Sequence, residues 1–206
     1  QNEKGIKELL DSINNYQGEY IPIQGDLSKI ADYEKMISNI FSLDAIIHNG
    51  GQSHYGLLTD LDFQTTQELL NVHVSAPLLL TKLLLPKMVQ KRKGNIIVIS
   101  SIWGQIGGSF EVAYSTVKGA QISFVKALSK EVALNGIRVN AIAPGAIETQ
   151  MVHHLQSDEL QMLKEEIPMG RLGKPEEIAK GVSFLLSDQA SYITGQVLSI
   201  NGGWYT

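Results

Sequence analysis

The segment Tyr114-Ser-Thr-Val-Lys118, which begins thirteen residues after Ser101, combines side chains suited to proton transfer. On a helix, residues four apart share one face, so this phenol and this ammonium can reach the same point. An unperturbed tyrosine has a pKa of about 10, and a cation held close to it favours the phenolate and lowers that pKa. A serine at the end of the preceding strand can hydrogen-bond the same substrate oxygen. The three residues predict proton transfer to or from a carbonyl oxygen while a hydride moves at carbon.

The composition excludes several other classes of function. The chain has 206 residues, 43% hydrophobic and 18% charged, which predicts a single domain over residues 1–206 with a full core. A net charge of −4 gives no electrostatic reason to bind nucleic acid or an anionic membrane. The absence of cysteine excludes disulfides and thiolate chemistry and agrees with a cytoplasmic location. The most apolar stretch, residues 76–85, is interrupted by Pro77 and Lys82 and is too short to span a bilayer.

Strand and helix patterns alternate along the chain and predict a parallel sheet with helices on both faces. The expected strands are residues 20–24, 43–47, 96–99, 137–143 and 196–200. One expected helix ends near residue 41. The others span residues 63–89, 112–134, 158–166 and 175–186, and Pro77 can kink the helix over residues 63–89. Such sheets bind ligands beyond the carboxyl ends of their strands. Asp26, Asn49, Ser101 and Pro144 all fall at that edge.

These ordered motifs resemble the classical short-chain dehydrogenase/reductase family over essentially the whole chain. The resemblance implies an α/β, Rossmann-like doubly wound sheet of strand order 3-2-1-4-5-6-7 and a nicotinamide cofactor, NADP or NAD. It also implies that Tyr114 is the acid/base, that Lys118 lowers its pKa and bonds the nicotinamide ribose, and that Ser101 positions the carbonyl.

The same resemblance assigns the cofactor contacts. Gly-Asp26-Leu27-Ser is similar to the segment that contacts the adenine ring, and residues 48–51 are similar to the family's Asn-Asn-Ala-Gly turn. Residues 144–149 are similar to the segment that holds the nicotinamide amide, and residues 201–203 match the C-terminal signature. With Tyr114 and Lys118, the expected cofactor-binding residues are Asp26, Leu27, Asn49, Gly50, Gly51, Pro144, Gly145, Ile147 and Thr149.

One departure from the family concerns its fourth catalytic residue, an Asn on the long helix before the serine strand. The matching position is His73. Because the family Asn acts largely through its backbone carbonyl, which holds a water in the proton relay, His73 can serve in the same way. An imidazole that titrates near neutrality would add a pH dependence, whereas the alternative is a histidine that only packs. Asn71, two residues away, is expected to point elsewhere.

Two further departures lie earlier in the chain. His48 and Gly50 replace the usual Asn and Ala, and we expect the turn to persist with altered packing beneath it. The family opens with a strand, a Gly-rich turn, a helix and a second strand, whereas residues 1–13 already predict the next helix. We therefore expect about 40 residues of the native protein to be missing, with strands 1 and 2 and the pyrophosphate site. A polypeptide of only these residues is expected to bind dinucleotide poorly.

The motifs that bear on the choice of substrate are consistent with more than one substrate. Residues 137–140, 170–177 and 191–195 are similar to 3-oxoacyl-(acyl-carrier-protein) reductases, which implies NADPH-dependent reduction of a 3-oxoacyl thioester in fatty acid biosynthesis by a homotetramer or homodimer. Residues 101–104, 111–114 and 202–205 resemble a bacterial subgroup that includes reductases of an aminopentanone group on a lysine of elongation factor P. Oxidation of sugar or steroid alcohols would use the same residues in reverse. A binding protein that keeps the fold without turnover is the non-enzyme alternative.

The expected substrate contacts are Ser101, Trp103, Tyr114 and Met151. Residues 151–167 are expected to form a lid with an apolar inner face, and Trp103 to line the pocket or pack at its rim. The pair His153-His154 does not predict a metal site, because adjacent helical residues point apart and no third ligand is evident.

Overall fold

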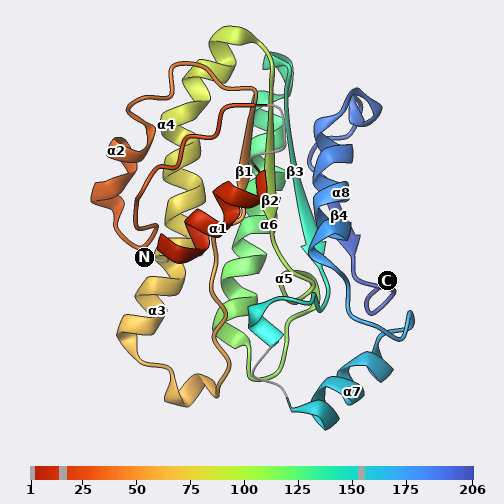
Figure 1. The fold of residues 1–206 in the computed structure, drawn as a ribbon. Helices are drawn as coiled ribbons and strands as arrows, with labels where there is room; N and C mark the ends of the chain where they lie inside the picture. The colour runs from red at the N-terminus through yellow and green to blue at the C-terminus, as the bar shows by residue number, and fades with distance from the viewer. Residues whose placement is uncertain (1–2, 14–17, 153–155) are drawn as a thin grey trace.

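A parallel sheet of four strands forms the centre of the computed structural model, which describes residues 3–13, 18–152 and 156–206 (Figure 1). The strands lie in the order β1 (Ala45–His48), β2 (Gly94–Ile99), β3 (Ile137–Pro144) and β4 (Val197–Ile200). Ile46 pairs with Ile96, and Ile97 with Asn140. The predicted α/β class is confirmed, and the four strands take the last four places of the expected order.

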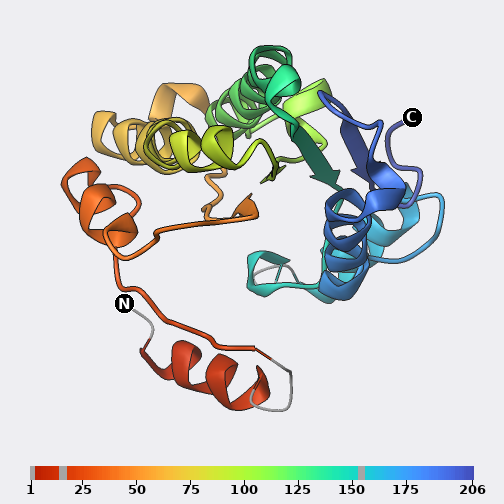
Figure 2. The same ribbon diagram turned by 90° about the horizontal axis from the view of Figure 1, so that it is seen from above.

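Helices cover both faces of this sheet (Figure 2). Helices α4 (Ala76–Lys91) and α6 (Val112–Val132) pack on one face against Ile96 and Val98 of β2. Helix α8 (Pro175–Leu186) packs on the other face against Ile97. A strand buried on both faces explains why residues 96–99 are β-branched throughout.

The five further helices that the structure describes are shorter. They are α1 (Glu3–Ile13), α2 (Tyr33–Ile37), α3 (Phe63–Leu70), α5 (Trp103–Ile106) and α7 (Ser157–Glu166). Short 3-10 turns cover Ile30–Asp32, Leu58–Asp60, Ala133–Asn135, Gln150–Val152 and Asp188–Ala190. Helix α1 lies apart from the sheet in Figure 2.

The long helix predicted at residues 63–89 forms as α3, a π-helical turn at Asn71–Ser75, and α4. At the end of the π turn, the backbone N–H of Ala76 donates to the carbonyl of Asn71, five residues earlier. Pro77 has no N–H, so it cannot donate to the carbonyl of His73, four residues before it. The helix is therefore irregular where its chain passes closest to α6.

The apolar stretch at residues 76–85 forms part of one continuous helix, as predicted for residues 63–89. Pro77 stands in the first turn of α4, where a missing N–H is tolerated, and the helix continues through Pro86. By length and composition alone, the continuous helix Phe63–Lys91 could cross a membrane. Leu84 and Met88 are nevertheless buried against the sheet, as in the core helix of a globular domain.

The predicted strand at residues 20–24 is wrong. This segment is extended but pairs with no strand among the described residues, and Ile21 is 71% exposed. Strand β1 pairs only with β2 in the described part of the chain. Because a strand needs a partner for its backbone groups, an apolar pattern alone does not form one.

Candidate active site

The carboxyl ends of the four strands place the predicted residues along one edge of the sheet. The turn 49–51 follows β1, Ser101 lies two residues after β2, and Gly145 follows β3. The backbone N–H of Ile102 donates to the carbonyl of Pro144 at 3.0 Å, and that of Gly145 to the carbonyl of Ile200 at 3.0 Å. The loops after β2, β3 and β4 are therefore tied together into one surface.

Helix α6 brings Tyr114 and Lys118 to Ser101, which is buried beside them. The Lys118 ammonium lies 5.5 Å from the centre of the Tyr114 ring. The hydroxyl of Ser101 accepts a hydrogen bond from the backbone N–H of Trp103 at 3.2 Å. The hydroxyl of Ser100 donates to the carbonyl of Lys118 at 2.9 Å and joins the end of β2 to α6. The three residues singled out by their spacing are thus held in one cluster.

Burial dominates the acidity of Tyr114. Burial raises the pKa of Tyr114 to about 12, the Glu111 carboxylate contributes in the same direction, and a hydrogen bond with Ser101 acts against them. The expected lowering of this pKa by Lys118 is not found, since burial is the largest cause of the shift and raises the pKa. Such a phenol is protonated at neutral pH, which is the form that donates a proton to a carbonyl oxygen.

Two acceptors hold the Lys118 ammonium. Nζ donates to the carbonyl of Ile99 at 2.9 Å and to Oε1 of Gln121 at 3.3 Å. Burial lowers the pKa of Lys118 to about 8, so the amine is mostly charged at neutral pH. An ammonium has three donor hydrogens, so one more is left for a ligand.

His73 is fully buried in the π turn. Its Nε2 lies 2.8 Å from the carbonyl oxygen of Gln52 and 3.1 Å from the Gln52 nitrogen. Burial and, secondarily, the charge of Lys118 lower the pKa of His73 to about 4, so the expected titration near neutrality is not found. A Cβ added to Gly51 would lie 2.8 Å from this ring. The imidazole therefore supports the turn after β1. The backbone carbonyl of His73 faces α6.

The Asp26 loop packs against the same turn, because Leu27 meets Gly50. Asp26 Oδ1 accepts hydrogen bonds from the Ser28 hydroxyl at 2.7 Å and the Ser28 backbone N–H at 2.9 Å, which lower the Asp26 pKa. A Cβ added to Gly50 would lie 2.3 Å from Cδ1 of Leu27, so the Leu27 side chain would have to shift to admit a larger residue at position 50.

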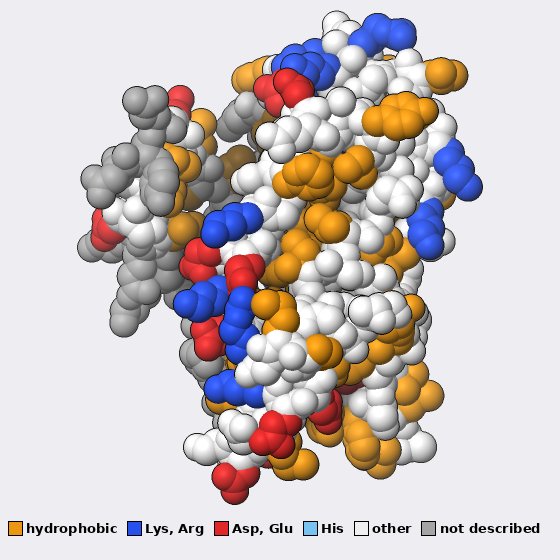
Figure 3. Space-filling view, turned by 90° about the vertical axis from the view of Figure 1, so that its right-hand side faces the viewer, with side chains coloured by type: hydrophobic (Ala, Val, Ile, Leu, Met, Phe, Trp, Pro, Cys, Tyr) orange, Lys and Arg blue, Asp and Glu red, His pale blue; other side chains and the backbone are white. Residues whose placement is uncertain are grey.

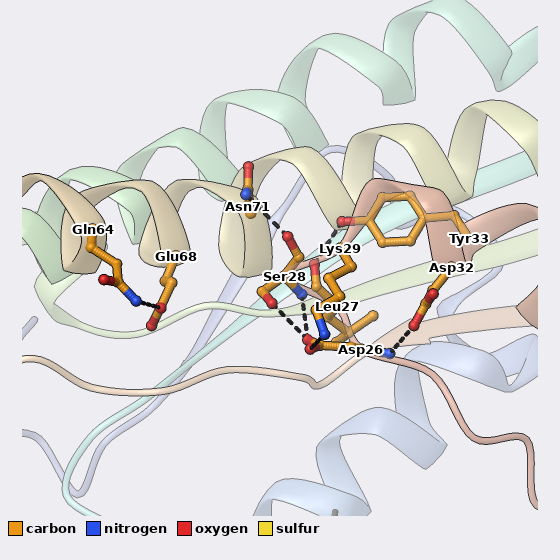
Figure 4. Close-up of polar contacts among 9 residues, drawn as sticks. All are labelled: Asp26, Leu27, Ser28, Lys29, Asp32, Tyr33, Gln64, Glu68 and Asn71. Atoms are coloured by element: carbon orange, nitrogen blue, oxygen red, sulfur yellow. Dashed lines mark hydrogen bonds and ion pairs between the residues drawn. The ribbon is translucent and has the colours of Figure 1, made fainter.

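Sequence reasoning missed the role of Asn71 in this arrangement. Its amide donates to the carbonyl of Ser28 at 3.0 Å and fastens the Asp26 loop to the π turn (Figure 4). The Asn71 side chain therefore faces the Asp26 loop. Its position at the first residue of a π turn could be seen only once the helix irregularity was known.

The expected nicotinamide segment packs against the loop after β4. A Cβ added to Gly145 would lie 2.9 Å from the Cα of Asn201, so only glycine fits there. Ile147 forms an isolated parallel bridge with Gly173, and the Thr149 hydroxyl donates to the Ile147 carbonyl at 3.4 Å. Residues 144–149 thus form a supported surface beside Ser101, while Asn49 is exposed at the opposite end of the strand edge.

The expected substrate contacts are less closely grouped. Trp103 meets Trp204 edge-to-face, with ring centres 5.2 Å apart, so it packs on the C-terminal segment. Met151 is 46% exposed and Met162 of α7 is 65% exposed, whereas Ile167 is buried. His153, His154 and Leu155 lie outside the described residues. Within the described ranges, no group of His, Cys, Asp or Glu side chains is arranged to hold a metal.

A doubly wound parallel sheet with Ser101, Tyr114 and Lys118 at its carboxyl edge defines a nicotinamide-dependent oxidoreductase of the short-chain type. The model of the enoyl-(acyl carrier protein) reductase family matches residues 1–205. The chain belongs to this short-chain dehydrogenase/reductase family and is an NAD(P)-dependent enzyme similar to 3-oxoacyl-(acyl-carrier-protein) reductases.

Three relatives show the extent of this similarity. An uncharacterized oxidoreductase of Bacillus subtilis (strain 168), YmfI, is 49% identical over 206 residues, which cover 99% of this chain and 85% of the relative. The 3-oxoacyl-[acyl-carrier-protein] reductase FabG of Aquifex aeolicus is 40% identical over 173 residues, covering 84% and 70%. That of Escherichia coli (strain K12) is 35% identical over 204 residues, covering 98% and 84%.

Proposed function

We propose that this enzyme reduces the ketone of a 3-oxoacyl thioester to a hydroxyl group with NADPH. The main observation in support of this proposal is that Ser101, a protonated Tyr114 and a charged Lys118 lie together at the carboxyl edge of the sheet. The names of the FabG relatives support a carrier-protein-bound thioester.

The residues at the strand edge fit the nicotinamide half of a dinucleotide. Lys118 has a donor hydrogen left for a ribose hydroxyl, and Gly145 brings the backbone of residues 144–149 beside Ser101. Asp26, half-buried and charged, would lie toward the adenine. A bound nicotinamide would supply the hydride.

The side chains of the protein would supply the proton transfer that accompanies the hydride. Ser101 receives the Trp103 N–H on its oxygen, so its own hydroxyl hydrogen is available to the substrate carbonyl oxygen. Tyr114 gives its proton to that oxygen as negative charge develops. Lys118 would hold the nicotinamide ribose beside this centre with its remaining hydrogen.

The test is oxidation of NADPH and of NADH by the full-length protein with a short 3-oxoacyl thioester. Turnover that prefers NADPH supports the proposal. Tight nucleotide binding without thioester turnover would overturn the substrate while leaving the class of enzyme intact.

The environment of Glu111 supports a second candidate substrate, a ketone that carries an ammonium group. Glu111 lies three residues before Tyr114, and its Oε2 is buried without a hydrogen-bond partner among the described residues. Burial raises the pKa of Glu111, as expected of a carboxylate that lacks a cation. The aminopentanone group on a lysine of elongation factor P has such an amine.

An amine-bearing ketone and its N-acetyl derivative separate the two candidates. If the ammonium is recognised, the amine form has the higher kcat/KM and Glu111→Gln removes the difference. Equal kcat/KM values for the two ketones would exclude the second candidate.

We also propose that the enzyme is a cytoplasmic homotetramer or homodimer. Strand β4 ends the sheet, and exposed sheet edges favour pairing. The side of the molecule that carries α8 and β4 gathers hydrophobic side chains (Figure 3). Light scattering on the eluting protein measures its mass, and a monomer at micromolar concentration would overturn this assembly.

A further inference from the structure

Gln121 of α6 is a buried polar side chain with no part in the chemistry described so far. It is 3% exposed and lies one turn after Lys118, so both side chains project from the same face of the helix. Burying an amide is costly unless its hydrogen-bonding groups are paired. The contacts of Gln121 therefore indicate why an amide stands at this position.

Both ends of this amide are paired. Nε2 donates to the carbonyl oxygen of His73 at 2.9 Å, and Oε1 accepts from the Lys118 ammonium at 3.3 Å. The His73 carbonyl is one that the helix cannot pair in the regular way, because Pro77 has no N–H. Gln121 thus connects the irregular turn of the long helix to the ammonium beside Tyr114.

The two partners fix the orientation of the amide. A carbonyl oxygen only accepts and an ammonium only donates, so Nε2 must face His73 and Oε1 must face Lys118. Turning the amide over would oppose two donors at one end and two acceptors at the other. Among side chains of this length, Gln alone satisfies both contacts, since Glu has no donor when it is ionised.

We propose that Gln121 is a positioning residue that, with the carbonyl of Ile99, holds two hydrogens of the Lys118 ammonium and aims the third at the nucleotide. This proposal rests on the proposed oxidoreductase function, in which Lys118 carries charge beside Tyr114 and binds the ribose. Gln121 itself touches neither substrate nor cofactor and acts through Lys118.

Two substitutions act on Lys118 in opposite directions. Gln121→Met keeps the volume but removes the acceptor, so the charged form of Lys118 is less favoured and its pKa falls. Gln121→Glu places a carboxylate beside the ammonium, so the pKa of Lys118 rises. The other titratable groups that face Lys118 are Tyr114 on the same helix and His73 on the π turn. His73 carries no charge near neutrality, since burial lowers its pKa to about 4.

The experiment follows the NMR titration of the Lys118 Cε resonance in the full-length, ligand-free protein, assigned by its loss in Lys118→Ala. We expect the Lys118 titration to move down by about one pH unit in Gln121→Met and up by a similar amount in Gln121→Glu. NADPH affinity at pH 7.5 should fall on the order of tenfold in Gln121→Met. The matched control is Gln64→Met, since Gln64 is exposed on α3 and bonds only Glu68.

Shifts of opposite sign, with no shift in the control, support the positioning role. Unchanged titration in both variants, or shifts in the same direction, would overturn it. If Gln121→Met fails to fold, the upward shift in Gln121→Glu decides alone. Because the titration needs no substrate, this result is independent of whether a 3-oxoacyl thioester is turned over.

Discussion

The imidazole of His73 meets the ring of Tyr114 edge-on, with ring centres 5.7 Å apart and an interplanar angle of 89°. The same imidazole closes the turn after β1 through Gln52 and fills the space that a side chain at position 51 would need. His73, at the position of the family Asn, therefore packs between Tyr114 and the turn after β1. Its backbone carbonyl, in turn, faces Gln121.

His73→Ala is expected to reduce stability more than catalysis. The substitution removes a buried ring and its hydrogen bond, which costs roughly 2–4 kcal/mol of unfolding free energy. The backbone carbonyl remains, so kcat should fall less than about tenfold. Urea unfolding and kcat at saturating substrate measure the two effects. A loss of several orders of magnitude in kcat, with the fold intact, would show that the imidazole itself takes part in proton transfer.

A double-mutant cycle tests the contact between His73 and Gly51. Gly51→Ala alone places a Cβ 2.8 Å from the ring and should destabilise the protein by about 1–3 kcal/mol. In the His73→Ala background the clash is gone, so the same substitution should cost much less. Equal costs in both backgrounds would mean that the turn, and not the imidazole, resists the side chain.

Tyr114→Phe is expected to remove turnover and leave nucleotide binding nearly intact. We propose that the phenol is the proton donor, and general acids contribute about 10² to 10⁴ in rate. The ring that packs on His73 is retained, so the fold should not change. Stopped-flow reduction and NADPH fluorescence titration measure the two quantities. Persistent turnover would reassign the proton donor.

Much of this arrangement follows from the sequence, but only where the pattern is local or repeated. The β-branched run at residues 96–99 predicted a strand buried on both faces, and the spacing of Ser101, Tyr114 and Lys118 predicted their convergence. The strand expected at residues 20–24 failed because strand formation depends on a partner. The acidity of Tyr114 was predicted with the wrong sign, since burial outweighs the ammonium.

Other features depend on contacts between segments far apart in the chain. Gln121 lies 48 residues from His73, and nothing in the local sequence of α6 shows that a carbonyl of the π turn faces it. The π turn itself was visible only as a proline in a helical pattern. In the same way, the contact of Leu27 with Gly50 becomes evident only when the Asp26 loop is placed beside β1.

Acid should destabilise the fold through two histidines, the buried His73 and the half-buried His48. Burial lowers the pKa values of His48 and His73 to about 4, from an ordinary value of 6.5. Because the unfolded chain binds these protons first, stability is fully present above pH 6.5 and is lost as the pH falls toward 4. Between pH 7.5 and 5.0, each histidine should account for on the order of 2 kcal/mol. Urea midpoints at pH 7.5 and 5.0 measure the loss.

The matched control for that loss is His48→Asn. His48 Nε2 lies 2.8 Å from the Thr81 hydroxyl, and an Asn amide keeps a polar group there without a titrating proton. The pH dependence of stability between pH 5.0 and 6.5 should become shallower in this variant. An unchanged slope would assign the acid sensitivity to other groups.

Raising the pH should weaken the hold of Lys118 on the nucleotide before it affects Tyr114. Burial lowers the pKa of Lys118 to about 8, from an ordinary value of 10.5, whereas the phenol keeps its proton until about pH 12. The ammonium is charged below pH 8 and neutral above it, so NADPH affinity and kcat/KM should both decline above about pH 8. Lys118→Ala should lower both at pH 7 and abolish this dependence of NADPH affinity. An affinity that stays constant from pH 7 to 9.5 in the unmodified enzyme would mean that the ammonium does not bind the nucleotide.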